Sequence, residues 1–147
     1  MKTLVLYGSL TGNTESVAQQ ISDFLHKNKI EHDLVNVAEF SPKKILNYDV
    51  LIIGCATWDY GQLQDDFKLF FAEIQNLDFT GKKLAAFGCG DSNYIEFCEA
   101  VKIIEQFWTS KKAEKIIAGL KIDGFPQQTS NQKLLTTWLN ELIKQLK

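Results

Sequence analysis

Short runs of apolar residues alternate along the chain with longer stretches whose apolar positions recur at helical spacing. Residues 4–7 and 49–55 form nearly continuous apolar runs, and turn-forming residues bound the second run. Such runs are typical of strands that are buried on both faces of a parallel sheet. The pattern therefore predicts an α/β fold in which helices cover both faces of a parallel sheet.

Five strands and four helices follow from this pattern. The expected strands are residues 4–7, 33–37, 49–55, 83–87 and 115–118, with an irregular segment at 119–126. The expected helices are residues 13–28, 65–75, 96–108 and one that begins near 131. The apolar faces include Val17, Ile21, Phe24 and Leu25, then Phe67, Phe70, Phe71 and Ile74, and finally Leu134, Leu135, Trp138, Leu139 and Leu142. Alternating elements in this number favour a doubly wound five-stranded parallel sheet in the order 2-1-3-4-5, a three-layer sandwich.

The length and composition are typical of one globular domain, which we expect to span residues 1–147. The chain is 45% apolar and shows no internal repeat and no abrupt change in composition. Its N-terminal apolar run is shorter than the apolar region of a signal peptide. No stretch approaches the roughly 20 apolar residues of a membrane-spanning helix. We therefore expect a cytoplasmic protein without a membrane partner.

Charge and cysteine content exclude several classes of function. The net charge is -2, and all 16 basic residues are lysines, so the guanidinium groups that bind nucleic-acid phosphates are missing and we expect no nucleic-acid partner. Acidic residues outnumber basic ones between residues 57 and 107, so one side of the molecule should attract a basic protein. Cys55, Cys89 and Cys98 are odd in number and lack CxxC spacing. We expect buried, reduced thiols and no metal site.

The expected sheet order points to three loops as a ligand site. In such sheets, ligands bind beyond the carboxyl ends of the strands where the strand order reverses, here after residues 7, 55 and 87. The first loop, residues 8–15, opens a helix, so its amides and hydroxyls converge where the helix dipole favours an anion. It has neither a GxGxxG pattern nor the lysine of a P-loop, which favours a phosphomonoester over a triphosphate. The alternative is that Ser9, Thr11 and Thr14 only cap the helix.

Large aromatic residues lie among turn-forming residues in the other two loops. Trp58 and Tyr60 follow the third strand, and Tyr94 follows the fourth. A flat conjugated ligand stacked between Trp58 and Tyr94 would explain both rings, because stacked aromatic faces attract one another. Asp59 and Asp91 would then border its polar edge. The alternative, that the rings cover the loops or form a protein interface, accounts less well for two aromatic residues on adjacent ligand loops.

With these residues in place, the chain closely resembles the flavodoxin family, specifically its short-chain members, over essentially its whole length. Residues 9–14 resemble the family's FMN-phosphate loop, 57–58 and 90–94 resemble its two ring-stacking loops, and 119–124 resemble its ending. The resemblance implies a flavodoxin-like fold and a low-potential one-electron carrier with non-covalently bound FMN, without catalytic residues or metal. It also implies redox partners, such as a flavodoxin/ferredoxin reductase and low-potential oxidoreductases, and a monomer.

The resemblance also implies the residues that hold the cofactor. They are Ser9, Leu10, Thr11, Gly12, Asn13 and Thr14 in a phosphate loop, Ala56, Thr57, Trp58, Asp59, Tyr60 and Gly61 in an inner loop, and Cys89, Gly90, Asp91, Tyr94, Phe97 and Cys98 in an outer loop. Leu10 stands where the family often has another hydroxyl. Asp59 stands where it usually has Gly or Asn, and the overall charge is less acidic than is typical of the family.

Two other functions use related folds. An FMN-dependent NAD(P)H:quinone reductase would need a nicotinamide site, and the chain has no Arg to select a 2′-phosphate. A response-regulator receiver shares the strand order but needs acidic residues after the first and third strands. The chain has Gly8-Ser9 and Cys55-Ala56 at those positions, which disfavours the receiver.

Overall fold

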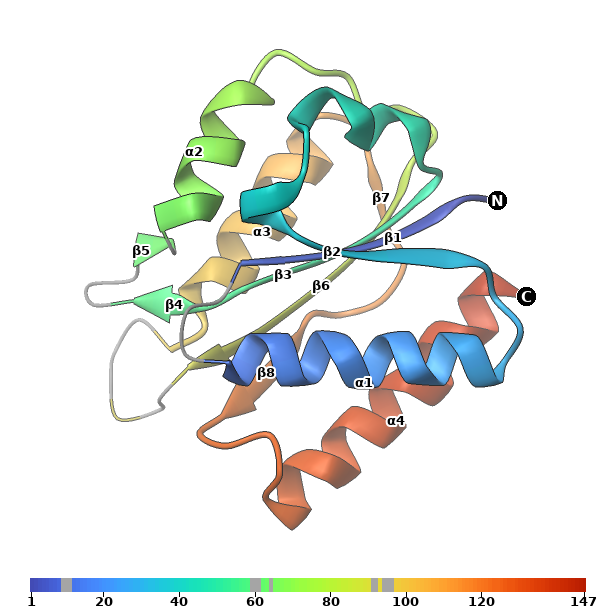
Figure 1. The fold of residues 1–147 in the computed structure, drawn as a ribbon, viewed down its shortest axis with the longest axis vertical. Coiled ribbons are helices and arrows are strands. Elements are labelled where there is room, and N and C mark those ends of the chain that lie inside the picture. The colour runs from blue at the N-terminus through green and yellow to red at the C-terminus, as the bar shows by residue number, and fades with distance from the viewer. Residues whose placement is uncertain (9–11, 59–61, 64, 91–92, 94–96) are drawn as a thin grey trace.

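The computed structural model describes residues 1–8, 12–58, 62–63, 65–90, 93 and 97–147 (Figure 1). The strands are β1 (Thr3–Gly8), β2 (His32–Asn36), β3 (Val50–Cys55), β4 (Thr57–Trp58), β5 (Gln62–Leu63), β6 (Lys83–Gly90), β7 (Glu114–Lys115) and β8 (Leu120–Asp123). The α-helices are α1 (Asn13–Lys27), α2 (Asp65–Glu73), α3 (Glu99–Ser110) and α4 (Thr129–Leu146), and two 3-10 helices are η1 (Val37–Glu39) and η2 (Pro42–Asn47).

A parallel sheet forms the middle layer. Its strands follow the order β2-β1-β3-β6, and β6 pairs along its far edge with both β7 and β8. The first residues of β6 pair with β7, and its last four pair with β8, so β7 and β8 are two pieces of one interrupted fifth strand. The predicted order 2-1-3-4-5 is confirmed. β4 and β5 form a separate antiparallel pair.

Helices cover both faces of the sheet (Figure 1). One apolar cluster joins the sheet to α1 and α4 through residues such as Ile21 and Leu139. The other joins it to α2 and α3 and includes Phe67 and Trp108. All residues of β3 are buried, as the sequence predicts for a central strand. No helix among the described residues is long and apolar enough to cross a membrane.

The sequence predicted most element boundaries to within three residues, but it was wrong near the C-terminus. The expected strand 115–118 pairs only as far as Lys115, and the expected irregular segment contains β8. β8 escaped notice because Leu120 and Ile122, its buried residues, alternate with exposed ones over only four positions between glycines. Leu134 does not join the apolar face of α4, because 45% of it is exposed.

Gly54 allows close packing between β3 and β6, which yields a test of the core. Gly54 pairs with Phe87, and a Cβ on Gly54 would overlap the fully buried Phe87 ring. Gly54→Ala should lower the free energy of unfolding by about 1–3 kcal/mol, because the rigid core must shift to admit a methyl group. Since the ring is the obstacle, Phe87→Ala should cost less in the Gly54→Ala background than in the wild type. Urea unfolding of the four proteins measures this coupling, and additive costs would contradict it.

Candidate cofactor-binding site

The three predicted ligand loops start at one end of the sheet. β1, β3 and β6 are adjacent and parallel, and Gly8 pairs with Cys55, so their carboxyl ends lie together. The start of α1 lies at the same end (Figure 1). The structure describes Gly12, Asn13, Thr14, Ala56, Cys89, Gly90, Phe97 and Cys98 in full, and Thr57 and Trp58 as backbone. The other predicted site residues, Ser9, Leu10, Thr11, Asp59, Tyr60, Gly61, Asp91 and Tyr94, lie outside the described residues.

The start of α1 has the form of an anion-binding helix terminus. Gly12 is the N-cap residue with φ 90°, a left-handed conformation that glycine adopts without steric cost. Its carbonyl accepts a hydrogen bond from the Ser16 amide at 2.8 Å, which closes the first turn. The Gly12 cap supplies no side chain to the amides that follow, and the first amides of a helix have no partner within the helix. This end of α1 therefore presents donors to an anion.

Thr14 is fully buried in the first turn of α1. Its hydroxyl has no hydrogen-bond partner among the described residues. The hydroxyl lies near the Cys89 thiol, whose pKa it lowers slightly. The two groups do not meet the geometric criteria of a hydrogen bond. A buried polar group without a partner costs about 1–3 kcal/mol, so a native protein retains one where a ligand or water completes it. The Thr14 hydroxyl and the helix amides, with no lysine in residues 8–15, match the needs of a phosphomonoester.

Glycines shape the base of the outer loop. A Cβ on Gly88 would lie 2.8 Å from the Cys55 carbonyl oxygen, and a Cβ on Gly90 would lie 2.9 Å from the Cys98 amide nitrogen. Among the described residues, the space beside Gly90 is occupied by Cys98 and Phe97. Cys98 is the N-cap residue of α3 and has φ 49°. The two ends of the outer loop are thus packed directly against each other.

The three cysteines are buried reduced thiols, as the sequence predicts. Burial raises the pKa of the Cys89 thiol to about 11 and that of the Cys98 thiol to about 12. Both thiols are therefore neutral at physiological pH and are poor nucleophiles. No cluster of candidate metal ligands occurs within the part of the chain that the structure describes. Cys89 and Cys98 thus present small, uncharged side chains to this end of the sheet.

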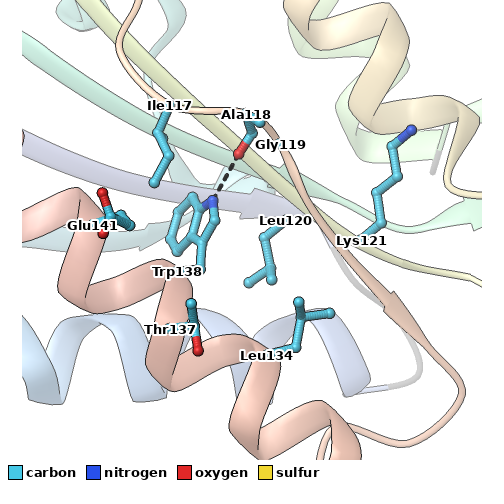
Figure 2. Close-up of a pocket in the computed structure, with 9 residues that line it drawn as sticks. All are labelled: Ile117, Ala118, Gly119, Leu120, Lys121, Leu134, Thr137, Trp138 and Glu141. Atoms are coloured by element: carbon cyan, nitrogen blue, oxygen red, sulfur yellow. Dashed lines mark hydrogen bonds between the residues drawn. The ribbon is translucent and has the colours of Figure 1, made fainter.

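A separate apolar cavity of about 370 Å³ lies between β8 and α4 (Figure 2). Figure 2 shows Ile117, Leu120 and Trp138 around it, with the Trp138 indole N–H donating to the Ala118 carbonyl oxygen at 2.8 Å. None of the predicted cofactor-binding residues lines this cavity. It is therefore distinct from the site at the strand ends.

Comparisons with known proteins identify the relatives of this chain. The family model described as Flavodoxin matches residues 5–138. A flavodoxin from Maridesulfovibrio salexigens is 42% identical over 86% of this chain and 89% of its own length. Probable flavodoxin 1 from Bacillus subtilis is 34% identical over 86% of this chain and 80% of its own length. The crystal structure of oxidised flavodoxin 2 from Bacillus cereus superimposes with a TM-score of 0.93 at 34% identity, covering 98% of this chain and 99% of that one.

The raised thiol pKa values predict a loss of stability at high pH. Below the ordinary thiol pKa of 9.0, Cys89 and Cys98 are protonated in both the folded and the unfolded chain, so their contribution to stability is fully present. As the pH rises from 9.0 toward the folded values of about 11 and about 12, the unfolded chain loses these protons first, and the free energy of unfolding falls.

Urea unfolding at a series of pH values, under reducing conditions, measures this fall. A variant with both Cys89→Ala and Cys98→Ala should show a shallower decrease above pH 9.0 than the wild type. Tyrosine and lysine titrations are common to both proteins and cancel in the comparison. Identical slopes would contradict the assignment.

Proposed function

The chain belongs to the flavodoxin family and is an FMN-binding electron carrier, and we propose that it holds FMN at the strand ends described above. In this proposal the phosphate lies at the start of α1, and the isoalloxazine ring lies between the inner and outer loops. The observation that carries the assignment is the fully buried Thr14 hydroxyl at the N-terminus of a glycine-capped helix, which has no hydrogen-bond partner among the described residues. FMN carries one phosphomonoester, the group for which this donor set is suited.

The residues of the chain bind and orient the cofactor and exclude water. FMN, when bound, supplies the redox chemistry by accepting and releasing electrons one at a time. Trp58 and Tyr94 would hold the ring by stacking against it. Ala56, Cys89 and Cys98 are buried and bring no charge to the site. The chain needs no catalytic acid, base or nucleophile for this role.

Acidic residues near the proposed flavin site support a low reduction potential for the second electron. Asp59 and Asp91 lie in the inner and outer loops, and Asp65 and Asp66 form the first turn of α2, which follows the inner loop. Negative charge near the ring opposes the addition of the second electron, because that electron makes the ring system more negative. The chain therefore releases electrons to acceptors at low potential.

The partners are redox proteins, and we assign them by charge and family. A flavodoxin/ferredoxin reductase is the proposed donor, and low-potential oxidoreductases are the proposed acceptors. Exposed Asp65 and Glu73 on α2 supply negative charge that attracts a basic partner surface. We further propose that the protein acts as a cytoplasmic monomer, with residues 1–147 forming one FMN-binding domain.

An anaerobic spectroelectrochemical titration of the FMN-loaded protein tests the function and the role of Tyr94 together. The wild type should bind FMN and be reduced at low potential. Tyr94→Ala should weaken FMN binding by about 2- to 13-fold, because an aromatic pair contributes about 0.5–1.5 kcal/mol, and should raise the potential of the second electron. Tyr94→Phe, which keeps the ring, should resemble the wild type.

A wild-type protein that cannot be loaded with FMN would overturn the function. An unchanged titration for Tyr94→Ala would overturn only the role of Tyr94. Oxidation of NADPH and reduction of a quinone by the isolated FMN-loaded protein, without a reductase, would indicate the quinone reductase instead.

Thr14→Val tests the phosphate contact, because valine keeps the shape of threonine and lacks the hydroxyl. FMN affinity should fall by about 10- to 150-fold, since a hydrogen bond to a charged group contributes about 1.5–3 kcal/mol. Affinity for riboflavin, which has no phosphate, should be unchanged. The stability of the apoprotein should not decrease, because the buried hydroxyl has no hydrogen-bond partner in the described part of the chain.

Fluorescence titration of the apoproteins with FMN and with riboflavin gives both affinities. Thr14→Ser restores the hydroxyl and should bind FMN nearly as tightly as the wild type. Equal losses for FMN and riboflavin in Thr14→Val would show that the residue acts on the whole site rather than on the phosphate.

A further inference from the structure

The connection between β8 and α4 contacts two elements of the proposed FMN site. The Gly124 amide donates to the Gly90 carbonyl oxygen at 2.9 Å, and Gly90 is the last residue of β6, where the outer loop begins. The Gln127 side-chain amide donates to the Ser16 hydroxyl at 3.2 Å, and Ser16 lies in the first turn of α1. The carboxyl ends of β8 and β6 lie side by side in Figure 1 and are paired through Gly90 and Asp123. A change in the position of this connection would therefore be transmitted to Gly90 in the outer loop and to Ser16 at the start of α1.

Asn131 fixes the shape of this connection. It is only 6% exposed, and its side-chain Nδ2 lies 2.8 Å from the Asp123 carbonyl oxygen and 2.9 Å from that of Phe125. A third acceptor, Gln128 Oε1, lies at 3.4 Å. The amide has two N–H groups, so the two shorter contacts use both. Because all three neighbours are acceptors, the opposite amide orientation would place oxygen against oxygen.

The two carbonyls that Asn131 holds lie on either side of Gly124. Gly124 has φ 80°, a left-handed conformation that glycine adopts easily. The chain therefore turns sharply at Gly124, and the orientation of its peptide groups differs from that in an extended strand. Fixing the carbonyls of Asp123 and Phe125 restrains this conformation from both sides. The restraint keeps the Gly124 amide directed at Gly90.

The same part of β8 also meets the far end of the outer loop. The Cys98 thiol lies 3.9 Å from the Ile122 carbonyl oxygen and 3.7 Å from that of Gly88. One S–H group can donate fully to only one of these acceptors. With the close packing of Gly90 on the Cys98 amide, both ends of the outer loop rest on the ends of β6 and β8. A shift of the turn at Gly124 would therefore move the frame that carries the outer loop.

We propose that Asn131 is a positioning residue for the ring-binding side of the site, acting through Gly124 and Gly90 on the outer loop. Asn131 touches only the backbone carbonyls and Gln128 among the contacts above, so its effect on the cofactor is indirect. The proposal rests on the proposed FMN function. It differs from the role of Thr14 in that it concerns the ring and not the phosphate.

The test compares Asn131→Ala with the wild type in titrations of the apoprotein with FMN and with riboflavin. Both affinities should fall by the same factor, about 2- to 30-fold, the range for residues that act on a site without touching the ligand. This pattern differs from that expected for Thr14→Val, which should lower the affinity for FMN and leave the affinity for riboflavin unchanged. Asn131→Leu keeps a large side chain and removes both donors, and it gives the same comparison if the alanine variant folds poorly.

Leu142→Ala is the matched control. Leu142 is fully buried on the same helix, so this variant loses apoprotein stability but leaves the turn at Gly124 intact. Under conditions where all variants are folded, it should bind both flavins like the wild type. A loss in Leu142→Ala equal to that in the Asn131 variants would overturn the proposal, since the effect would then reflect general loosening of α4.

Two further outcomes separate this proposal from the function itself. If the wild type binds both flavins and the Asn131 variants bind them equally well, the positioning role is wrong and the FMN function stands. A loss for FMN alone would also overturn it, because the route would then run through Gln127 and Ser16 to the phosphate. A wild type that binds neither flavin would overturn the function and this proposal together.

Discussion

The burial of β3 on both faces is the constraint on which the rest of the structure depends. Every residue of β3 is buried, so its backbone amides and carbonyls can be satisfied only by the ladders to β1 and β6. Both ladders are parallel, and parallel strands must end on the same side. The loops after β1, β3 and β6 therefore meet, although more than 40 residues separate Gly8 from Cys55 in the chain. The proximity of the loops follows from satisfying the buried backbone.

The same constraint explains why the site can contain groups that do not stabilise the fold. Helices on both faces bury two apolar clusters, and these supply the stability. The start of α1 can then keep a buried Thr14 hydroxyl without a partner among the described residues, and Cys98 can begin α3 at φ 49°, although each lowers stability locally. Unfavourable features of this kind gather where a ligand offsets them. Their position at the strand ends agrees with a site for a bound phosphate and ring.

Sequence reasoning predicted the fold well where one residue pattern decides the structure. The apolar run of β3 and the helical spacing in α1 and α2 left little choice, because burial on a sheet dictates both patterns. β8 was missed because two apolar residues in four carry almost no periodic signal. Leu134 was placed in the core because it follows the apolar spacing of α4, but it lies beside the buried face of that helix and is exposed.

The site was predictable as a set of loops and not as a set of contacts. Hydroxyls and glycines after a strand mark a phosphate loop, and aromatics among turn residues mark a flat ligand, because local sequence determines these features. The burial of Thr14 depends on how α1 packs across the sheet, and no local pattern reports it. Asn131 gave no signal at all, since its partners are backbone carbonyls, which every residue type provides.

Different contacts hold the helices on the two faces of the sheet. On the α2 and α3 side, rings pack tightly, with Phe71 and Phe107 centroids 4.5 Å apart and Trp108 edge-on to both. On the α1 and α4 side, Asn131 bonds the connection between β8 and α4, and Gln127 in that connection donates to Ser16 at the start of α1. Because β8 pairs only with the last four residues of β6, its end lies level with Gly90. The pairing of β8 therefore places the turn at Gly124 beside Gly90, and the Asn131 side chain holds it there through the carbonyls of Asp123 and Phe125.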